Sequence, residues 1–486
     1  MQKTLKYIRI IAIMLLVFPV ITNLQTSSTV QLVNGQITTL PREETFYHHI
    51  DGGRISDVTQ YNALSGESSD MLKAGLNQGV VESLFYYNLL NGTLYPWLGE
   101  SIEMSPDFLT CTIKVRHGVK WNDGEDFTAH DVAFTINLLL QSHTPPLRSE
   151  GAVQLKIASV DLIDDYTVRL NLKKPDPRFL GSSLICPDWT VHLPIVPEHI
   201  YKDVEDVTTF KNPDCVYTGP YKIIDASPTG DWVVYERRDD YWGTKVLGIR
   251  PAAKYMVFVF YEAWDAIAQQ MISNNLDMCP LLDAGTFRSM RQQNAYIRCW
   301  DLENPAFFEN VPFILTVNCL KYPWNNYLVR QAISRYFDRD AINEISQGGV
   351  SPPHAGIVGP LIMPEFAALQ IEKGEQRGAL EYNPSKADAM LTSLGWSKGG
   401  DGVWVTENGT RVKAEVLVFG DFGSYMIYYG DQICDQLREA GFDVYEKTLV
   451  SAARTDAHNK GLWDFAATWQ FGGPMGASAG DVWGPL

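Results

Sequence analysis

The sequence predicts an α/β protein built from two or three domains, and three observations support this. The chain has 486 residues, which is too long for one ordinary hydrophobic core. Hydrophobic residues make up 45% and aromatic residues 12% of it, as in a globular chain. Apolar runs of strand type, such as residues 313–318, alternate with helical stretches that carry start and stop signals, such as residues 383–395.

Residues 1–28 have the organisation of an export signal. Basic residues precede and overlap an apolar run from Ile8 to Ile21, and the small polar residues 26–28 follow. The apolar run is shorter than the roughly 20 residues that a membrane-spanning helix needs. We therefore expect a signal peptide, with an uncleaved N-terminal anchor as the alternative.

The stretch at residues 114–140 is the best-specified local unit. It contains a strand, a tight turn at Asn122-Asp123-Gly124 and a helix that begins after Thr128. Thr128 and Asp131 have the spacing of a capping box, and Val132 and Ile136 begin an apolar stripe at helical spacing. The stretch predicts a strand–turn–helix unit without catalytic residues.

Turn and capping residues delimit the other predicted elements. Asn383-Pro384 provides an N-cap and a first helical residue, and Gly395 ends that helix. Gly441 likewise ends a helix that begins at Tyr425. The remaining elements are expected as a strand at 46–50, a largely helical stretch within 66–100, strands within 153–173, a hairpin within 215–243, a helix at 263–274, a strand at 313–318 and a hairpin at 402–418.

No metal or cofactor motif is present, and none is expected to be used. His48 and His49 are adjacent strand residues, so their side chains point to opposite faces and do not easily grip one ion. The seven cysteines include no C-x-x-C pair. One disulfide between Cys279 and Cys299 and a set of buried free thiols are both compatible with the spacing.

Several of these segments also carry a family resemblance. The residues concerned are Pro96-Trp97, Val115-Arg116-His117-Gly118-Val119, Trp121-Asn122-Asp123-Gly124, Thr128-Ala129-His130-Asp131-Val132, Thr218-Gly219-Pro220-Tyr221 and Val329-Arg330-Gln331-Ala332-Ile333. In this order they resemble the family 5 extracellular solute-binding proteins, the dipeptide, oligopeptide and nickel receptors of ABC importers.

The resemblance implies a type II periplasmic-binding-protein-like fold, in which two lobes with mixed sheets are joined by a hinge and the first lobe carries an inserted subdomain. Residues 41–65 and 201–305 are expected to form lobe I, residues 66–200 the inserted subdomain and residues 306–486 lobe II. The return of the chain to lobe I that is usual in the family is apparently missing after residue 486.

The resemblance also places a ligand between the lobes. The residues that it implies as ligand contacts are Asp51 and Gly52 in lobe I and Phe419, Asp421, Tyr425, Trp469, Phe471 and Gly472 in lobe II. In peptide-binding relatives, aspartates follow the tryptophan, and one of them pairs with the amino terminus of the ligand. Here Gly472-Gly473-Pro474 takes their place, so a sugar ring and a peptide held by its backbone suit the site equally well.

The function implied is that of the extracellular substrate-binding component of an ABC importer. Its ligand would be a peptide or an oligosaccharide, and its partners a membrane permease and the ATPases that drive it. The protein is expected to be a monomer at the extracellular or periplasmic face of the membrane, with which it associates through the permease or an N-terminal anchor. The net charge of −17 argues against nucleic acid as a partner. A secreted glycoside or peptide hydrolase is the alternative, although the sequence contains no H-E-x-x-H, P-loop or G-x-G-x-x-G motif.

Overall fold

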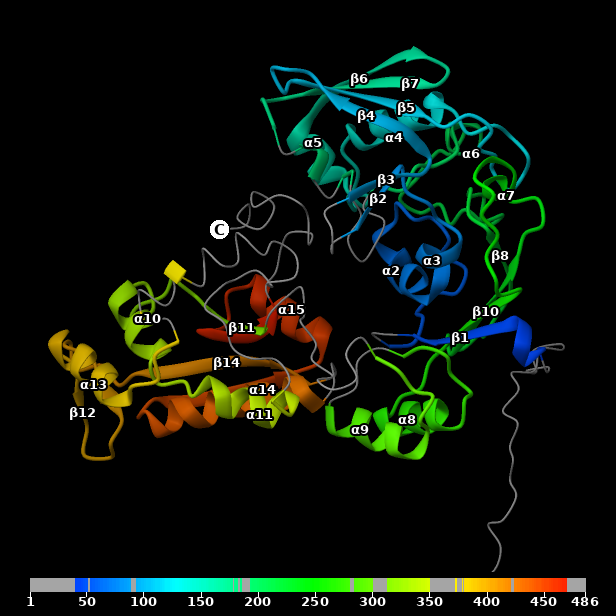
Figure 1. The fold of residues 1–486 in the computed structure, drawn as a ribbon. Helices are drawn as coiled ribbons and strands as arrows, with labels where there is room; N and C mark the ends of the chain where they lie inside the picture. The colour runs from blue at the N-terminus through cyan, green and yellow to red at the C-terminus, as the bar shows by residue number, and fades with distance from the viewer. Residues whose placement is uncertain are drawn as a thin grey trace, which may run out of the picture. The chain divides into compact units, whose positions relative to one another are not determined.

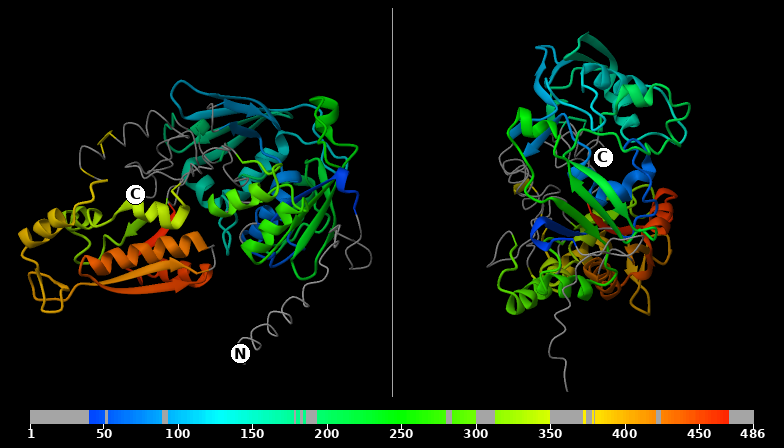
Figure 2. Two further views of the ribbon diagram at one scale, coloured as in Figure 1. Left: turned by 60° about the horizontal axis from the view of Figure 1, so that its bottom comes forward. Right: turned by 90° about the vertical axis from the view of Figure 1, so that its right-hand side faces the viewer.

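The computed structural model describes residues 40–50, 53–88, 93–177, 179–181, 184–185, 193–279, 284–299, 313–349, 372–373, 378, 380–420 and 424–469. The chain divides into two units, Met1–Glu44 and Thr45–Leu486. Within the described residues, the first unit contains one short helical turn, η1 (Arg42–Glu44). The elements described below belong to the second unit (Figures 1 and 2).

A four-stranded mixed sheet, called here the first sheet, joins strands that are far apart in the sequence. Its strands lie in the order β1-β10-β9-β8, where β1 pairs parallel with β10 and the other pairs are antiparallel (Figure 1). The strands are β1 (Thr45–His49), β8 (Tyr221–Ala226), β9 (Trp232–Arg237) and β10 (Tyr255–Val259). The β8–β9 pair is the hairpin predicted within residues 215–243, and its turn places Gly230 at a φ of +75°.

The chain between β1 and β8 forms a separate antiparallel sheet with its own helices, called here the antiparallel region. Its strands lie in the order β4-β5-β7-β6, and helix α4 packs on β6 and β7. The elements of this region are the hairpin β2 (Phe85–Asn88) and β3 (Thr93–Pro96), the strands β4 (Gly99–Met104), β5 (Thr110–Val115), β6 (Ile157–Asp164) and β7 (Thr167–Leu172), and the helices α4 (Ala129–Leu139), α5 (Glu150–Lys156), η4 (Phe179–Gly181) and α6 (Glu198–Tyr201).

The predicted strand–turn–helix unit is confirmed. Strand β5 leads to the Asn122–Gly124 turn, in which the N–H of Gly124 donates to Trp121 O over 3.1 Å. The capping box at the start of α4 is formed in both directions: the Thr128 hydroxyl accepts from the backbone, and Asp131 Oδ2 accepts from the N–H of Thr128 over 2.9 Å.

The prediction of a largely helical stretch within residues 66–100 is wrong for its second half, where β2, β3 and the start of β4 lie. The helical part, residues 66–79, is irregular. It consists of the short helical turns η2 (Gly66–Ser68), α2 (Ser69–Met71), η3 (Leu72–Leu76) and α3 (Asn77–Gly79). Gly75 interrupts them with a φ of +107°, and a Cβ at this position would lie 2.6 Å from the rings of Phe258 and Tyr235. The close approach to the first sheet therefore bends the chain at Gly75.

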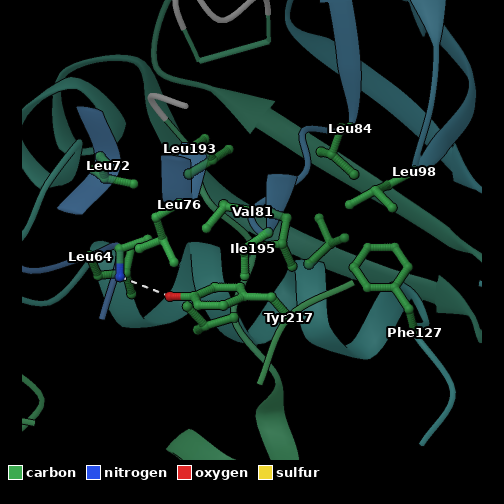
Figure 3. Packing of buried hydrophobic residues seen from close by; sticks show 14 of the residues in the cluster. Leu64, Leu72, Leu76, Val81, Leu84, Leu98, Phe127, Leu193, Ile195 and Tyr217 are labelled. Atoms are coloured by element: carbon green, nitrogen blue, oxygen red, sulfur yellow. Dashed lines mark hydrogen bonds between the residues drawn. The ribbon is translucent and has the colours of Figure 1, made fainter. Parts of the chain in front are cut away.

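The first sheet and the antiparallel region share one hydrophobic cluster. It includes buried residues from Ile50 to Phe258, so the first sheet and the antiparallel region share a core. Within this cluster the Tyr217 hydroxyl accepts from the N–H of Ala63 over 2.8 Å (Figure 3). The same hydroxyl donates to Tyr61 O over 2.7 Å. Residues packed around this tyrosine in Figure 3 include Leu64, Leu76, Val81 and Ile195.

The C-terminal part of the chain forms another four-stranded mixed sheet, called here the second sheet. Its strands lie in the order β11-β16-β14-β15; β14 is parallel to both β15 and β16, and β11 is antiparallel to β16. They are β11 (Phe313–Val317), β14 (Lys413–Phe419), β15 (Asp443–Leu449) and β16 (Phe465–Trp469). Helix α14 (Ser424–Glu439) connects β14 to β15 and packs on the sheet, and α15 (Ser451–Asn459) connects β15 to β16 (Figure 2).

A separate hydrophobic cluster is formed by residues of the second sheet and of the elements packed on it. Its buried residues extend from Trp324 to Ala467 in the sequence. The helices and the short hairpin that accompany the two mixed sheets are α7 (Trp242–Val246), α8 (Trp264–Ile272), α9 (Ala284–Gln293), α10 (Tyr327–Ser334), α11 (Arg339–Gln347), α13 (Pro384–Ser393), β12 (Ser397–Lys398) and β13 (Trp404–Val405).

Two of the predicted helices begin and end where the sequence signals indicate. In α13, the Asn383 side chain accepts from the N–H of Lys386 over 3.0 Å, and Gly395 follows the helix at a φ of +85°. Helix α14 ends before Gly441, whose φ is +96°. The hairpin predicted at 402–418 is only partly correct, because β13 pairs with β12 while β14 pairs with β15 and β16.

Neither a membrane span nor the suggested disulfide is found among the described residues. No described helix combines the length and the apolar composition that crossing a bilayer requires. Cys279 and Cys299 are both described, and no disulfide joins them.

Candidate ligand-binding site

The carboxyl ends of three neighbouring strands meet at one edge of the second sheet. Strands β14, β15 and β16 run parallel, and their last residues are Phe419, Leu449 and Trp469. The next amide after β14, the N–H of Gly420, donates to Leu449 O over 2.8 Å and keeps two of these ends together. In open α/β sheets, ligands bind outside the carboxyl ends of the strands. We call this edge the second-sheet edge.

A buried arginine lies beneath the second-sheet edge. Arg454 comes from α15, and its side chain is 1% exposed. Its guanidinium carbon is 4.0 Å from the centroid of the Phe419 ring, and its Nη2 donates to Ala467 O over 3.4 Å. Burial lowers the pKa of Arg454 to about 10, so the guanidinium remains charged at neutral pH. The side chain thus contacts both β14 and β16 close to their ends.

Of the lobe II residues implied as ligand contacts, Phe419 is described in full. It ends β14 and is 6% exposed. The backbone of Trp469 ends β16, and the backbone of Tyr425 lies in the first turn of α14. Asp421, Phe471 and Gly472 lie outside the described residues. The structure thus brings the backbones of Phe419 and Trp469 to one edge, as expected for a shared site.

The first sheet has a comparable edge where the parallel strands β1 and β10 end. His49 ends β1, and its ring stacks with those of Phe260 and Tyr261 at centroid distances of 5.9 and 6.2 Å. Arg54 lies over Phe260 at 5.4 Å and is held by Asp231, whose Oδ1 accepts from Arg54 Nε over 2.6 Å. The result is a layered stack of three rings and one guanidinium, which we call the first-sheet edge.

The lobe I contacts implied by the resemblance, Asp51 and Gly52, lie outside the described residues. Asp51 and Gly52 directly follow Ile50, one residue after the end of β1. His49 is 4% exposed, and desolvation, assisted by the neighbouring His48, lowers the pKa of its imidazole to about 4. The ring is therefore neutral at physiological pH.

Both edges carry groups of the kinds that bind solutes by stacking and hydrogen bonding. Strand-end amides lie at both edges, and the first-sheet edge adds the rings of Phe260 and Tyr261 and the Arg54 guanidinium. Among the described residues, no group of histidine, cysteine and carboxylate side chains is arranged as a metal site.

Sequence reasoning missed Arg54, Phe260, Tyr261 and Arg454. Phe260 and Tyr261 extend the aromatic run of β10, which is also the composition of an ordinary buried strand. Arg454 lies among small and polar residues, a context that predicts exposure. Its burial depends on Phe419 and Ala467, which no local pattern connects to it.

The comparisons with known proteins decide the family. Residues 93–480 match the family model described as bacterial extracellular solute-binding proteins, family 5, middle part. The chain belongs to this family. It is similar to putative ABC transporter peptide-binding proteins of Brucella species, with 28% identity over 308 residues, which are 62% of this chain and 52% of those proteins. The chain therefore matches about half the length of these relatives.

Solved structures of oligopeptide-binding proteins share the fold of this chain. A periplasmic oligopeptide-binding protein of Thermotoga maritima superimposes with a TM-score of 0.77 at 22% identity, covering 90% of this chain and 78% of that one. The Bacillus subtilis oligopeptide-binding protein AppA gives a TM-score of 0.64 at 20% identity, covering 87% and 79%. These likenesses confirm the type II periplasmic-binding-protein-like fold with mixed α/β sheets.

Proposed function

We propose that this chain is the extracellular substrate-binding component of an ABC importer. The observation that carries the proposal is the second-sheet edge, where the carboxyl ends of the neighbouring strands β14 and β16 lie at one edge of the sheet in a member of family 5. The solute would enter between the two lobes, and contacts to both would stabilise a closed form by population shift. In this scheme lobe I comprises residues 41–65 and 201–305, the inserted subdomain residues 66–200, and lobe II residues 306–486.

The solute is proposed to be a peptide or an oligosaccharide. Among the structural neighbours, AppA was solved with a nonapeptide, and the Thermotoga protein was solved with mannohexaose. Gly472-Gly473-Pro474, where peptide-binding relatives have aspartates, removes a partner for a peptide's amino terminus. This substitution supports oligosaccharide binding as the second candidate, because a sugar ring needs aromatic platforms and hydrogen bonds but no such carboxylate.

The closed complex is proposed to dock on a membrane permease driven by ATPases. The chain would act there as a monomer, exported to the outer face of the membrane by residues 1–28 or held there by them. In this role the chain captures and releases its solute without changing it, and it needs no cofactor. A hydrolase would instead convert the solute, and this difference separates the two functions experimentally.

Mass spectrometry of the small molecules released from the purified protein tests the proposal. The protein is incubated with mannohexaose and with the peptide RPPGFSPFR, which was solved in complex with OppA of Haemophilus influenzae. It is then exchanged into fresh buffer and denatured. Recovery of one of these probes with unchanged mass, or of an endogenous peptide or oligosaccharide, is the expected result. Recovery of cleaved probe would favour the hydrolase, and recovery of no solute at all would contradict the importer role.

A further inference from the structure

Arg454 occupies an unusual place for a charged side chain. It belongs to α15, a helix whose Ala457 lies in a small buried apolar cluster with Leu417, Trp463 and Ala466, and it is itself 1% exposed. Arginine is almost never fully buried in proteins, because removing the guanidinium from water is unfavourable. An apolar side chain of similar length would fill the same space without that cost.

The contacts of Arg454 suggest what compensates this cost. Its planar guanidinium lies against the Phe419 ring at 4.0 Å, an arrangement that strengthens when both groups are desolvated. Its Nη2 donates to Ala467 O, two residues before the end of β16. Arg454 therefore connects the terminal residue of β14 to the last part of β16 from below.

We propose that Arg454 is a positioning residue for solute binding, which holds the Phe419 ring and the ends of β14 and β16 in the arrangement that receives the solute. This inference rests on the proposed function. It assigns Arg454 no contact with the solute: the guanidinium acts through Phe419. Buried polar groups that break a local rule of stability are characteristic of functional sites, and this one lies directly under the candidate site.

Two substitutions separate positioning from simple packing. Arg454→Met keeps the length and apolar volume but removes the charge and the planar fork. Arg454→Lys keeps the charge but loses the fork, so it should rescue binding only in part. Arg438→Met is the matched control, because Arg438 is an exposed arginine of α14 that is paired with Asp435 over 2.7 Å.

Hydrogen exchange provides a readout without any solute. The N–H of Gly420 depends on the β14–β15 pairing at the edge that Arg454 supports. In Arg454→Met, peptides containing Gly420 should exchange roughly tenfold faster, whereas peptides from the amino end of β14 should exchange as in the wild type. Unchanged exchange at Gly420 would overturn the proposal, even if neither probe bound the wild-type protein.

Affinity for RPPGFSPFR and mannohexaose provides the functional readout. For the probe that the wild type binds, the affinity of Arg454→Met should be about tenfold lower, measured at a temperature at which circular dichroism shows the variant to be folded. Combined with Phe419→Leu, the losses should be clearly less than multiplicative, because Arg454 acts through that ring. Wild-type affinity in Arg454→Met, or independent losses in the double variant, would overturn positioning. Binding of neither probe by the wild type would instead count against the importer role.

Discussion

The indole N–H of Trp242 donates a 2.9 Å hydrogen bond to Oε2 of Glu82, and Trp242 belongs to the hydrophobic cluster shared by the first sheet and the antiparallel region. The other carboxylate oxygen of Glu82 accepts from the Tyr241 hydroxyl over 2.6 Å and from the Trp97 indole over 2.8 Å. Glu82 is 6% exposed. One buried carboxyl group therefore joins the α7 region next to the first sheet to the start of the antiparallel region.

Glu82→Gln should destabilise the protein by about 1–3 kcal/mol, the usual effect of leaving a buried donor unpaired. The two carboxylate oxygens of Glu82 accept from three donors, whereas glutamine has one acceptor oxygen. Its amide group would replace the other oxygen and would face a donor without accepting from it. Urea unfolding monitored by tryptophan fluorescence measures the difference. Glu103→Gln, a substitution of an exposed glutamate on β4, is the control and should leave the free energy of unfolding nearly unchanged.

The same group predicts a pH dependence. Desolvation raises the pKa of Glu82 above its ordinary value of 4.5, against the opposing effect of its hydrogen-bond donors. From pH 4.5 up to the raised pKa, the folded state binds the proton that the unfolded state has lost, so this contribution to stability falls as the pH rises through that range. Glu82→Gln should lack this fall. An identical pH dependence in both proteins would show that the carboxyl group titrates normally.

His49 predicts the opposite trend on the acid side. Burial lowers its pKa from 6.5 to about 4, so the unfolded state takes up a proton below pH 6.5 that the folded state does not bind. Its contribution is complete above pH 6.5 and is lost as the pH falls towards 4, with a total of roughly 3 kcal/mol. His49→Gln should flatten the stability profile over this range in urea titrations. If His130→Gln, a surface substitution, flattened it equally, the effect could not be assigned to His49.

The cap of α4 predicts a graded loss of stability. Thr128→Ala should cost about 1 kcal/mol, the typical value for an N-cap. Asp131→Ala should cost more, because Asp131 also accepts from the N–H of Glu198 over 2.9 Å and so joins α4 to the start of α6. Thermal unfolding of both variants, with the exposed Asn137→Ala as control, tests the order. Equal effects of the two substitutions would contradict the bridging role of Asp131.

Elements whose partners are close in the sequence were predictable, and Thr128 with Asp131 shows why. A cap, a turn or a helix stop is formed within a few residues, so its signal is complete in a short window. The bend at Gly75 was not predictable, because its cause is the approach of Phe258 and Tyr235. Both rings are distant from residue 75 in the sequence, so the local pattern predicts one continuous helical stretch.

The residues of the candidate site likewise include some that the sequence indicates and others that only the structure reveals. Phe419 and Trp469 could be placed from the family resemblance, because it fixes their order relative to the strands. Arg454 and the ring stack around His49 could not, since they arise from contacts between elements distant in the sequence, such as the 4.0 Å approach of Arg454 to Phe419. Residue type also misled here, because an arginine between small polar neighbours predicts a solvated helix face.

The most direct test of solute binding at the second-sheet edge is isothermal titration calorimetry of the wild type, Trp469→Ala and Tyr445→Ala with RPPGFSPFR and mannohexaose. Tyr445 is an exposed aromatic residue in the body of β15 rather than at its carboxyl end, and its loss should leave binding unchanged. Trp469→Ala should weaken the binding seen in the wild type at least tenfold, about 1.4 kcal/mol, without lowering the unfolding midpoint. Wild-type affinity in Trp469→Ala, or no binding of either probe by the wild type, would contradict the account.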